Sequence, residues 1–312
     1  MALDTAGRVT TGSRAPRPAL RRAAWSPRPP VYFAAPAAIF VVMFVGYPMF
    51  ELVRMSVSEV TPATLLRDWP FVGFANFVEL FNDTRFTATV IRTVVFGLVV
   101  LVIGVVGGLT AALALHARSR LGALTYALIV LMWALPPIVS GVTWRFMLFA
   151  DGIVNQLLIS IGVIQDPILF LIDGALPLLS VAFVAGWVAL PFATIVFRAA
   201  LLDVPHELYE AATVDGAARA AQFRYITLPS IAPTVYVVSI LLLSYAVRSF
   251  DFTFVMTGGG PGNASTTLPV FGYRTAFAAF DYSGGAAVAV ITILAVLFFA
   301  LPYARSIRRR AQ

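Results

Sequence analysis

The stretch GALPLLSVAFVAGWVALPFATIVF, residues 174–197, contains no Asp, Glu, Lys or Arg. A helix of this length can cross the hydrocarbon core of a bilayer, which takes roughly 20 apolar residues. Five further runs without these charged residues, each 22 to 24 residues long, occupy 29–50, 93–115, 121–144, 225–247 and 282–304. The chain is 60% hydrophobic and 12% charged, about half the charged fraction of an average soluble domain. We therefore expect an all-α integral membrane protein with six transmembrane helices, and not six buried helices in a soluble protein.

The predicted transmembrane domain covers residues 29–305. Its spans are expected near 29–54, 90–115, 121–148, 174–200, 229–250 and 282–304. Residues 1–28 are rich in Arg, Pro, Ser and Ala, a composition typical of a disordered tail. Residues 306–312 are expected to form a second basic tail. The first apolar run is longer than the core of a cleaved signal peptide, which is roughly 7–15 residues, so we expect it to remain as the first span.

The basic residues are all arginines, 22 in number, and they are distributed unevenly. If six spans alternate, one side of the membrane receives 15 of them, in residues 1–28, 116–120, 198–229 and 305–310. The loops on the opposite side, 56–88, 149–173 and 251–282, hold only three. Because cytoplasmic loops carry the excess of Lys and Arg, both termini are predicted to be cytoplasmic. The net charge of +7 follows from this asymmetry, and we do not interpret it as nucleic-acid binding.

The chain contains no cysteine and no lysine. Without lysine it has no P-loop, whose Lys reaches the nucleotide phosphates, and no Schiff-base lysine. The two histidines, His116 and His206, lack a neighbouring nucleophile or a set of metal ligands. We therefore expect no catalytic site, no metal site and no cofactor in this chain, and a membrane enzyme is a weak alternative.

One polar segment, residues 203–229, interrupts the apolar sequence on the predicted cytoplasmic side and contains ELYEAATVDGAARAAQFRYITLP, residues 207–229. Pro205 suits the first turn of a helix, and Gly216 suits the left-handed residue that follows a helix. The pattern predicts two short helices, near 205–214 and 217–226, before the fifth span. A solvated connector and a docking element for a partner fit these residues equally well.

The same residues resemble the EAA signature of membrane subunits of binding-protein-dependent ABC importers. The resemblance begins at Glu210-Ala211-Ala212, continues through Asp215-Gly216-Ala217 and ends at Leu228-Pro229 without a gap. Four other stretches agree, and they are GFANF at 73–77, DGIVNQLL at 151–158, Gly186-Trp187 followed by Pro191, and FDFTFVMTGGGP at 250–261. Together they resemble the carbohydrate-type permeases, the class of the maltose and glycerol-phosphate importers, over about residues 30–305. The implied architecture is the type I ABC importer permease fold.

The resemblance implies a mechanism in which this chain has no ATPase site of its own. In such permeases the EAA segment is a coupling helix that docks into a cleft of a separate ABC ATPase, which binds ATP and Mg. Carried over, Glu210 would pair with a basic residue of the ATPase, Ala211 and Ala212 would pack into the cleft, and Asp215, Gly216 and Ala217 would form the turn. The implied partners are two ATPase copies, a second homologous permease in a heterodimer, and an extracytoplasmic solute-binding protein or lipoprotein. The implied location is the bacterial cytoplasmic membrane.

The substrate path is less well marked by the sequence. Sugar sites combine aromatic faces with hydrogen-bonding groups, and our candidates are Trp144, Tyr245, Ser249 and Asp251. Anchoring at the membrane interface or packing between helices is the more common role for such aromatic residues, and Arg145, Arg248 and Asp251 equally suit structural ion pairs. We expect a sugar or sugar-like solute. A non-sugar solute is the alternative within the ABC importers, and an ion-coupled secondary transporter is a weaker one because ionisable residues are missing from the span centres.

The predicted external loops are the expected contact surfaces for the solute-binding protein. Loop 56–88 contains FVGFANFVELF at 71–81, which suits a short amphipathic helix in the membrane interface. Residues 152–172 are apolar but include Asn155, Gln165 and Asp166, so we expect an external hairpin and not a further span. The glycine-rich loop 257–268 is expected to form tight turns.

Overall fold

The computed structural model describes residues 34–115 and 120–310, so the predicted tail at 1–28 lies outside the described residues. The regular secondary structure of the described residues is helical, with loops between the helices and one isolated β-bridge between Ser58 and Phe71. The chain forms two units, residues 1–48 and 49–312. The first unit holds α1 (Ala35–Val41), η2 (Val42–Gly46) and the start of α2 (Tyr47–Ser56). These elements belong to the apolar helix Ala35–Ser56, whose 22 residues are enough to span a membrane.

The second unit contains the remaining helices. Their bounds are α3 (Ala75–Asn82), α4 (Thr84–Val102), η3 (Ile103–Gly107), α5 (Gly108–Ala114), α6 (Arg120–Trp133), α7 (Pro137–Met147), α8 (Ile153–Ser160), α9 (Leu176–Leu202), α10 (His206–Val214), α11 (Arg219–Gln222), η4 (Phe223–Thr227), α12 (Leu228–Val247), α13 (Asp251–Thr257), α14 (Leu268–Tyr273), η5 (Arg274–Ala278) and α15 (Tyr282–Arg310). The η elements are π-helical turns inside longer helices. Continuous apolar helices thus cover Thr84–Ala114, Leu176–Leu202, Arg219–Val247 and Tyr282–Leu301, and they overlap the predicted second, fourth, fifth and sixth spans.

The predicted third span, 121–148, is not one continuous helix. It is divided into α6 and α7, and the segments Gly122–Trp133 and Pro137–Met147 meet at an angle of 101°. Pro136 and Pro137 lie at the break. Proline lacks the backbone N–H that a helix interior needs and pushes the preceding residue out of the helical conformation, so two in succession end α6 and begin α7.

The predicted fifth span, 229–250, begins earlier than expected. α11, η4 and α12 form one 29-residue helix, Arg219–Val247, so the separate second short helix predicted at 217–226 is wrong. Pro229 cannot donate to the carbonyl one turn before it. The wider π turn at Phe223–Thr227 lies immediately upstream, and its i→i+5 pattern accommodates the proline ring without ending the helix.

Small residues allow the central helices of the second unit to pack closely. A Cβ added at Gly108 of α5 would lie 2.6 Å from the Ala193 Cβ and 3.2 Å from the Ala193 carbonyl carbon in α9. At Gly104 an added Cβ would lie 2.7 Å from a Leu242 methyl carbon in α12. Glycine at such crossings lets backbones approach each other in a membrane, where packing drives helix association. The crossing of α5 with α9 therefore depends on Gly108.

We predict that Gly108→Ala destabilises the protein by about 1–3 kcal/mol, because an overpacked contact forces the two helices apart. The midpoint of thermal unfolding of the purified protein in detergent measures this effect. Gly97→Ala is the matched control, since its added Cβ would lie 3.7 Å from the Leu243 methyl carbon, an ordinary contact distance. Equal midpoints for the two variants would contradict the close crossing.

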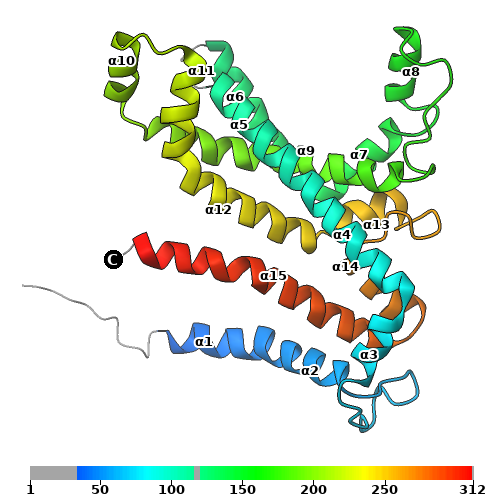
Figure 1. Cartoon of the computed structure of the whole chain (residues 1–312). Coiled ribbons are helices and arrows are strands. Elements are labelled where there is room, and N and C mark those ends of the chain that lie inside the picture. Colours follow the sequence, from blue (N-terminus) through cyan, green and yellow to red (C-terminus); the bar gives the residue numbers. More distant parts are fainter. Residues whose placement is uncertain (1–33, 116–119, 311–312) are drawn as a thin grey trace, which may run out of the picture. The chain divides into compact units, whose positions relative to one another are not determined.

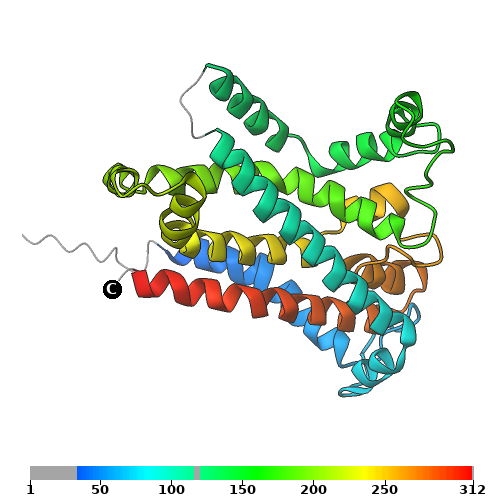
Figure 2. The same cartoon turned by 45° about the horizontal axis from the view of Figure 1, so that its top comes forward.

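The helices of the second unit run between two ends of that unit. α10 and the C-terminal end of α15 lie at one end, and α3, α8 and α13 lie at the other (Figures 1 and 2). We call them the α10 end and the α8 end. α9 and the helix Arg219–Val247 run between the two ends and frame the buried core. This arrangement separates the segment 203–229 from the loops predicted to be external.

Candidate functional site

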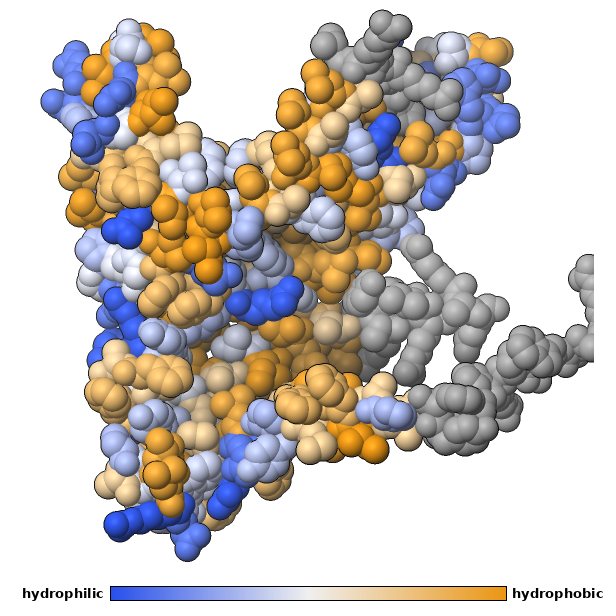
Figure 3. Space-filling view, turned by 180° about the vertical axis from the view of Figure 1, so that it is seen from behind, coloured by the Kyte–Doolittle hydropathy of each residue, from blue (hydrophilic) through white to orange (hydrophobic). Residues whose placement is uncertain are grey.

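α10 presents the central residues of the predicted coupling segment on an exposed surface. Glu210, Ala211 and Asp215 are exposed, and Ala212 and Ala217 are half-buried. Val214 is 87% exposed, which is unusual for a valine. Figure 3 shows hydrophilic residues gathered at the tips that α8 and α10 form on this face of the molecule. An exposed carboxylate beside exposed apolar residues suits a contact with another protein.

Gly216 closes α10 as predicted. Its φ of +76° lies in the left-handed region, where glycine has no steric penalty. The Ala217 N–H donates to the Ala212 carbonyl at 2.8 Å, and the Gly216 N–H donates to the Thr213 carbonyl at 3.1 Å. These bonds satisfy carbonyl groups at the end of the helix. A Cβ added at Gly216 would meet no atom within 4 Å, so the backbone conformation alone requires glycine there.

Two side-chain contacts fix α10 to the helix Arg219–Val247. The Tyr209 hydroxyl lies 3.0 Å from the Thr227 hydroxyl. The Gln222 amide donates to the Thr213 hydroxyl and to the Ala217 carbonyl, each at 3.1 Å. These contacts join residues up to 18 positions apart and could not be predicted from the sequence. They make α10 a braced element whose movement is shared with the following helix.

Glu210 has a neighbour in His206, one turn earlier on α10. The His206 Nδ1 lies 3.0 Å from a Glu210 carboxylate oxygen. Both side chains are well exposed, at 82% and 68%, and exposed ion pairs contribute little to stability. The carboxylate is therefore free to exchange this partner for another. The i,i+4 spacing was the available sequence signal for the pair.

The four candidates for the substrate path lie toward the α8 end, and two of them share one cluster. Trp144 and Tyr245 both pack against the buried core around Phe96 and Val184. Ser249 is buried and Asp251 begins α13. The structure thus brings together the aromatic candidates and leaves the polar ones beyond the end of α12.

Aromatic contacts surround Trp144. Its ring centre lies 5.2 Å from that of Trp187 and 5.7 Å from that of Phe183, both in edge-to-face geometry. Nearby, the Arg145 guanidinium donates to the Val255 carbonyl at 3.2 Å. Arg145 therefore joins α7 to α13 through a backbone carbonyl, and it forms no ion pair with a described residue. Trp144 of α7 therefore packs against two aromatic residues of α9, in the edge-to-face geometry that aromatic pairs prefer.

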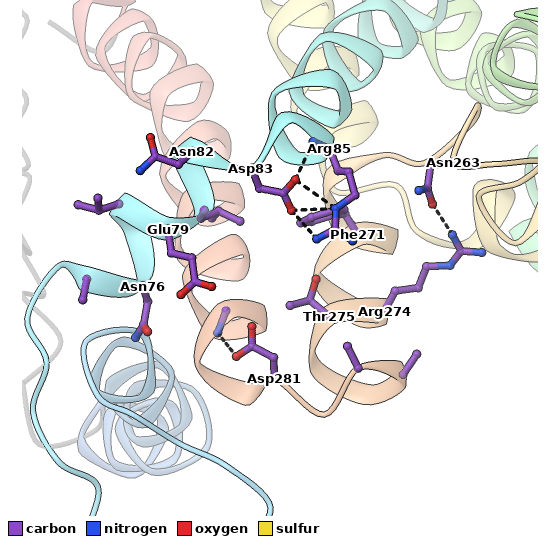
Figure 4. Close-up of a pocket in the computed structure, with 16 residues that line it drawn as sticks. Asn76, Glu79, Asn82, Asp83, Arg85, Asn263, Phe271, Arg274, Thr275 and Asp281 are labelled. Atoms are coloured by element: carbon purple, nitrogen blue, oxygen red, sulfur yellow. Dashed lines mark hydrogen bonds and ion pairs between the residues drawn. The ribbon is translucent and has the colours of Figure 1, made fainter.

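A large polar pocket lies at the α8 end, between α3 and the start of α4 on one side and α14, η5 and the start of α15 on the other. Its volume is about 1120 Å³. Figure 4 shows Glu79 of α3 and Asp281 on facing sides of this space. Other polar lining residues are Asn76, Asn82, Asp83, Arg85, Asn263, Arg274 and Thr275. The pocket joins the first and third predicted external loops, 56–88 and 251–282, and α8 of the second loop does not line it.

Two pairs of side chains order the walls of this pocket. Arg85 binds Asp83 with nitrogen–oxygen distances of 2.9 to 3.1 Å, and the Arg274 guanidinium donates to the Asn263 side-chain oxygen at 2.8 Å. The side-chain hydrogen bond from Arg85 lowers the pKa of Asp83, and the same bond raises the pKa of Arg85. Asp83 therefore stays ionised at neutral pH and caps α4 through the Arg85 N–H at 2.8 Å.

Asn155 holds the hairpin 152–172, which contains the eight-residue helix α8 and, as predicted, no helix long enough to span a membrane. The side chain is fully buried. Its amide donates to the carbonyls of Phe149 and Ile168 at 3.1 and 2.9 Å, and its oxygen accepts from the Ile168 N–H at 2.9 Å. Asn155 is thus the link between the two arms of the hairpin.

We predict that Asn155→Leu costs at least about 2 kcal/mol, because it leaves buried backbone groups without partners. The hairpin should open locally, and cleavage by proteinase K within 161–175 should become faster. Gln156→Leu is the matched control, because Gln156 is exposed and makes one side-chain bond, to the Asp151 carbonyl. Similar cleavage rates in the two variants would contradict the role of Asn155.

Comparisons with known proteins agree with this architecture. The family model described as "Binding-protein-dependent transport system inner membrane component" matches residues 104–312. The trehalose/maltose transport system permease protein of Thermococcus litoralis is 31% identical, over 86% of this chain and 90% of that protein. The diacetylchitobiose uptake system permease protein of Streptomyces coelicolor is 31% identical over 98% and 93%. The sn-glycerol-3-phosphate transport system permease protein of Yersinia pestis is 30% identical over 91% and 95%.

Solved structures share the fold. A chain of a bacterial ABC transporter that imports the acidic polysaccharide alginate superimposes with a TM-score of 0.72, at 23% identity, over 89% of this chain and 94% of that chain. A chain of the alginate transporter in complex with an alginate pentasaccharide-bound periplasmic protein gives a TM-score of 0.69, at 24% identity, over 86% and 91%. The predicted type I importer permease fold is confirmed.

Proposed function

This chain belongs to the family of binding-protein-dependent transport system inner membrane components, and on that premise we propose that it carries a sugar or sugar-like solute inward across the bacterial cytoplasmic membrane. It is the permease subunit of an ABC importer and forms part of the translocation path. Relatives named for trehalose/maltose, diacetylchitobiose and sn-glycerol-3-phosphate support the substrate class. A non-sugar solute remains the alternative within the family.

The observation that carries the proposal is the braced and exposed α10. It offers Glu210 and Ala211 to a partner, while Tyr209 and Gln222 fix it to a helix that runs to the opposite end of the unit. In this proposal two copies of a separate ATPase bind ATP and Mg, and each engages the α10 of one permease chain. This chain supplies no nucleotide site and no cofactor. The second permease is a homologous partner, so the pair is a heterodimer.

The proposed orientation places the α10 end and both termini in the cytoplasm. The excess of arginine in the segments on that side supports it. The α8 end then faces the solute-binding protein, and the polar pocket between α3 and η5 provides a surface where that protein can bind. Trp144, Tyr245, Ser249 and Asp251 remain the candidates for solute contact.

Transport by the intact complex tests the proposal. The complex is co-purified with its ATPase and binding protein, the binding protein is screened by thermal shift against sugars and amino acids, and the stabilising solute is followed into proteoliposomes. We expect a shift with a sugar and uptake that needs internal ATP. A shift with amino acids alone would overturn the substrate class. Uptake that a protonophore abolishes and ATP depletion does not would overturn the importer mechanism.

A further inference from the structure

Arg198 is an arginine inside an apolar transmembrane helix, and it lacks an acidic partner among the residues that the structure describes. It lies four residues before the end of α9 at Leu202. Its Nε is buried and makes no hydrogen bond, and none of the ion pairs among the residues that the structure describes includes it. Arginine is always charged and carries five N–H donors. A guanidinium placed this way in a membrane protein calls for an anion from outside the chain.

Tyr126 of α6 supports the guanidinium on one side. The central carbon of the Arg198 guanidinium lies 4.3 Å from the centre of the Tyr126 ring. This stacking is a favourable cation–π contact and fixes the plane of the group. The ring face attracts the positive charge of the guanidinium. It accepts no hydrogen bond from the N–H groups, because these lie in the plane of the guanidinium and point past the ring. The edge of the guanidinium therefore stays available for a planar anion such as a phosphate.

The position of Arg198 along α9 indicates where that anion comes from. Four residues of helix correspond to about 6 Å, so Arg198 lies just inside the α10 end of the span. α6, which carries Tyr126, also starts at this end, at Arg120. Arginine side chains near a span end extend toward the membrane surface. The anions that lie at this depth in a bilayer are the phosphates of phospholipids.

We propose that Arg198, supported by Tyr126, binds the phosphate of an anionic phospholipid in the leaflet at the α10 end. A paired set of N–H donors to two phosphate oxygens is a strong, oriented contact for arginine. The site lies between α6 and α9, one turn before the connection to α10. Anionic lipid bound there stabilises the end of α9 from which the coupling segment emerges. The choice of leaflet rests on the proposed orientation, but lipid binding itself does not.

Native mass spectrometry of the intact importer tests the site. The complex is titrated with phosphatidylglycerol and, separately, with phosphatidylcholine. Arg198→Gln should weaken phosphatidylglycerol binding about fivefold, the effect of one basic residue at an anionic membrane surface. Phosphatidylcholine binding should not change. Arg198→Lys keeps the charge but loses the planar fork, so its binding should be intermediate.

Arg224→Gln is the matched control. Arg224 is exposed at the same end and lies 6.0 Å from the Tyr225 ring, so this variant removes the same charge without touching the α6–α9 site. Unchanged lipid binding in Arg198→Gln would overturn the proposal, as would an equal loss in Arg224→Gln. If millimolar inorganic phosphate displaced the lipid, the ligand of Arg198 would be a soluble anion and not a lipid, and the proposal would be overturned. If Arg198→Gln fails to assemble, Tyr126→Leu carries the test, because it removes the ring and keeps the charge, and it too should weaken binding.

Discussion

Glu210→Ala should abolish ATP-driven import while the protein still reaches the membrane. In the proposed complex the Glu210 carboxylate leaves its exposed contact with His206 and pairs with a basic residue in the ATPase cleft. Removing one member of a buried, hydrogen-bonded charge pair at an interface costs about 2–5 kcal/mol, which corresponds to a roughly thirtyfold or larger loss. The measurement is uptake of the solute into proteoliposomes at saturating ATP, together with ATP hydrolysis stimulated by the binding protein.

The matched control is Glu207→Ala. Glu207 lies on the same helix and is also exposed, and it is outside the residues that match the EAA signature. Its removal alters the local charge equally, and we expect import close to that of the unchanged protein. Normal import by Glu210→Ala would reject the docking role of this carboxylate. Equal losses in the two variants would show a general effect of charge at the α10 end.

Gly216→Pro is expected to disconnect the ATPase from the transmembrane helices. The native φ at Gly216 is +76°, whereas the proline ring fixes φ near −65°. Proline also removes the N–H that donates to the Thr213 carbonyl at 3.1 Å. The turn must then rebuild, and α10 loses its position relative to Thr227. We expect at least a tenfold loss of import, measured as before, and weaker co-purification of the ATPase.

Two variants separate the turn from general strain. Gly216→Asn should keep most of the import activity, because Asn adopts the left-handed conformation more readily than other residues and the site has open space. Gly162→Pro changes a glycine with a φ of +74°, but at the α8 end of the unit. It should leave the ATPase bound. Loss of ATPase binding in Gly162→Pro would mean that the effect at Gly216 is not specific.

The spans were predictable from sequence because membrane burial leaves a simple record, a run of residues without charge. The break in the third span was missed, although Pro136 and Pro137 are visible signals, because hydropathy averages over the prolines. The start of the fifth span was misplaced because there the prolines were given too much weight. Pro229 and Pro233 suggested a helix start, but a π turn lets the helix pass Pro229. Proline always removes one backbone hydrogen bond, but whether the helix ends there depends on the surrounding backbone.

Some residues of the candidate site could be predicted from the sequence, and others could not. The Asp215-Gly216 step correctly predicted the turn that closes α10, because that turn depends on one backbone conformation. The contact of Tyr209 with Thr227 could not be predicted, since it depends on how two helices meet. Asn155 was recognised only as an obstacle to a further span. Its role in holding the hairpin appears once Ile168 is brought beside it. The polar pocket likewise exists only after residues near 80 and 280 come together.

The continuous helix Arg219–Val247 has a mechanical consequence. Its 29 residues make a strut about 43 Å long, with α10 attached near one end and the Asp251 helix following the other. Proline removes a backbone hydrogen bond, and Pro229 and Pro233 lie just before and at the middle of this helix. The helix is thus weakest near its middle and intact on either side. In the proposed complex, a push of the ATPase on α10 would bend the helix near Pro229 and Pro233, and the half that leads to the α8 end would tilt as one body.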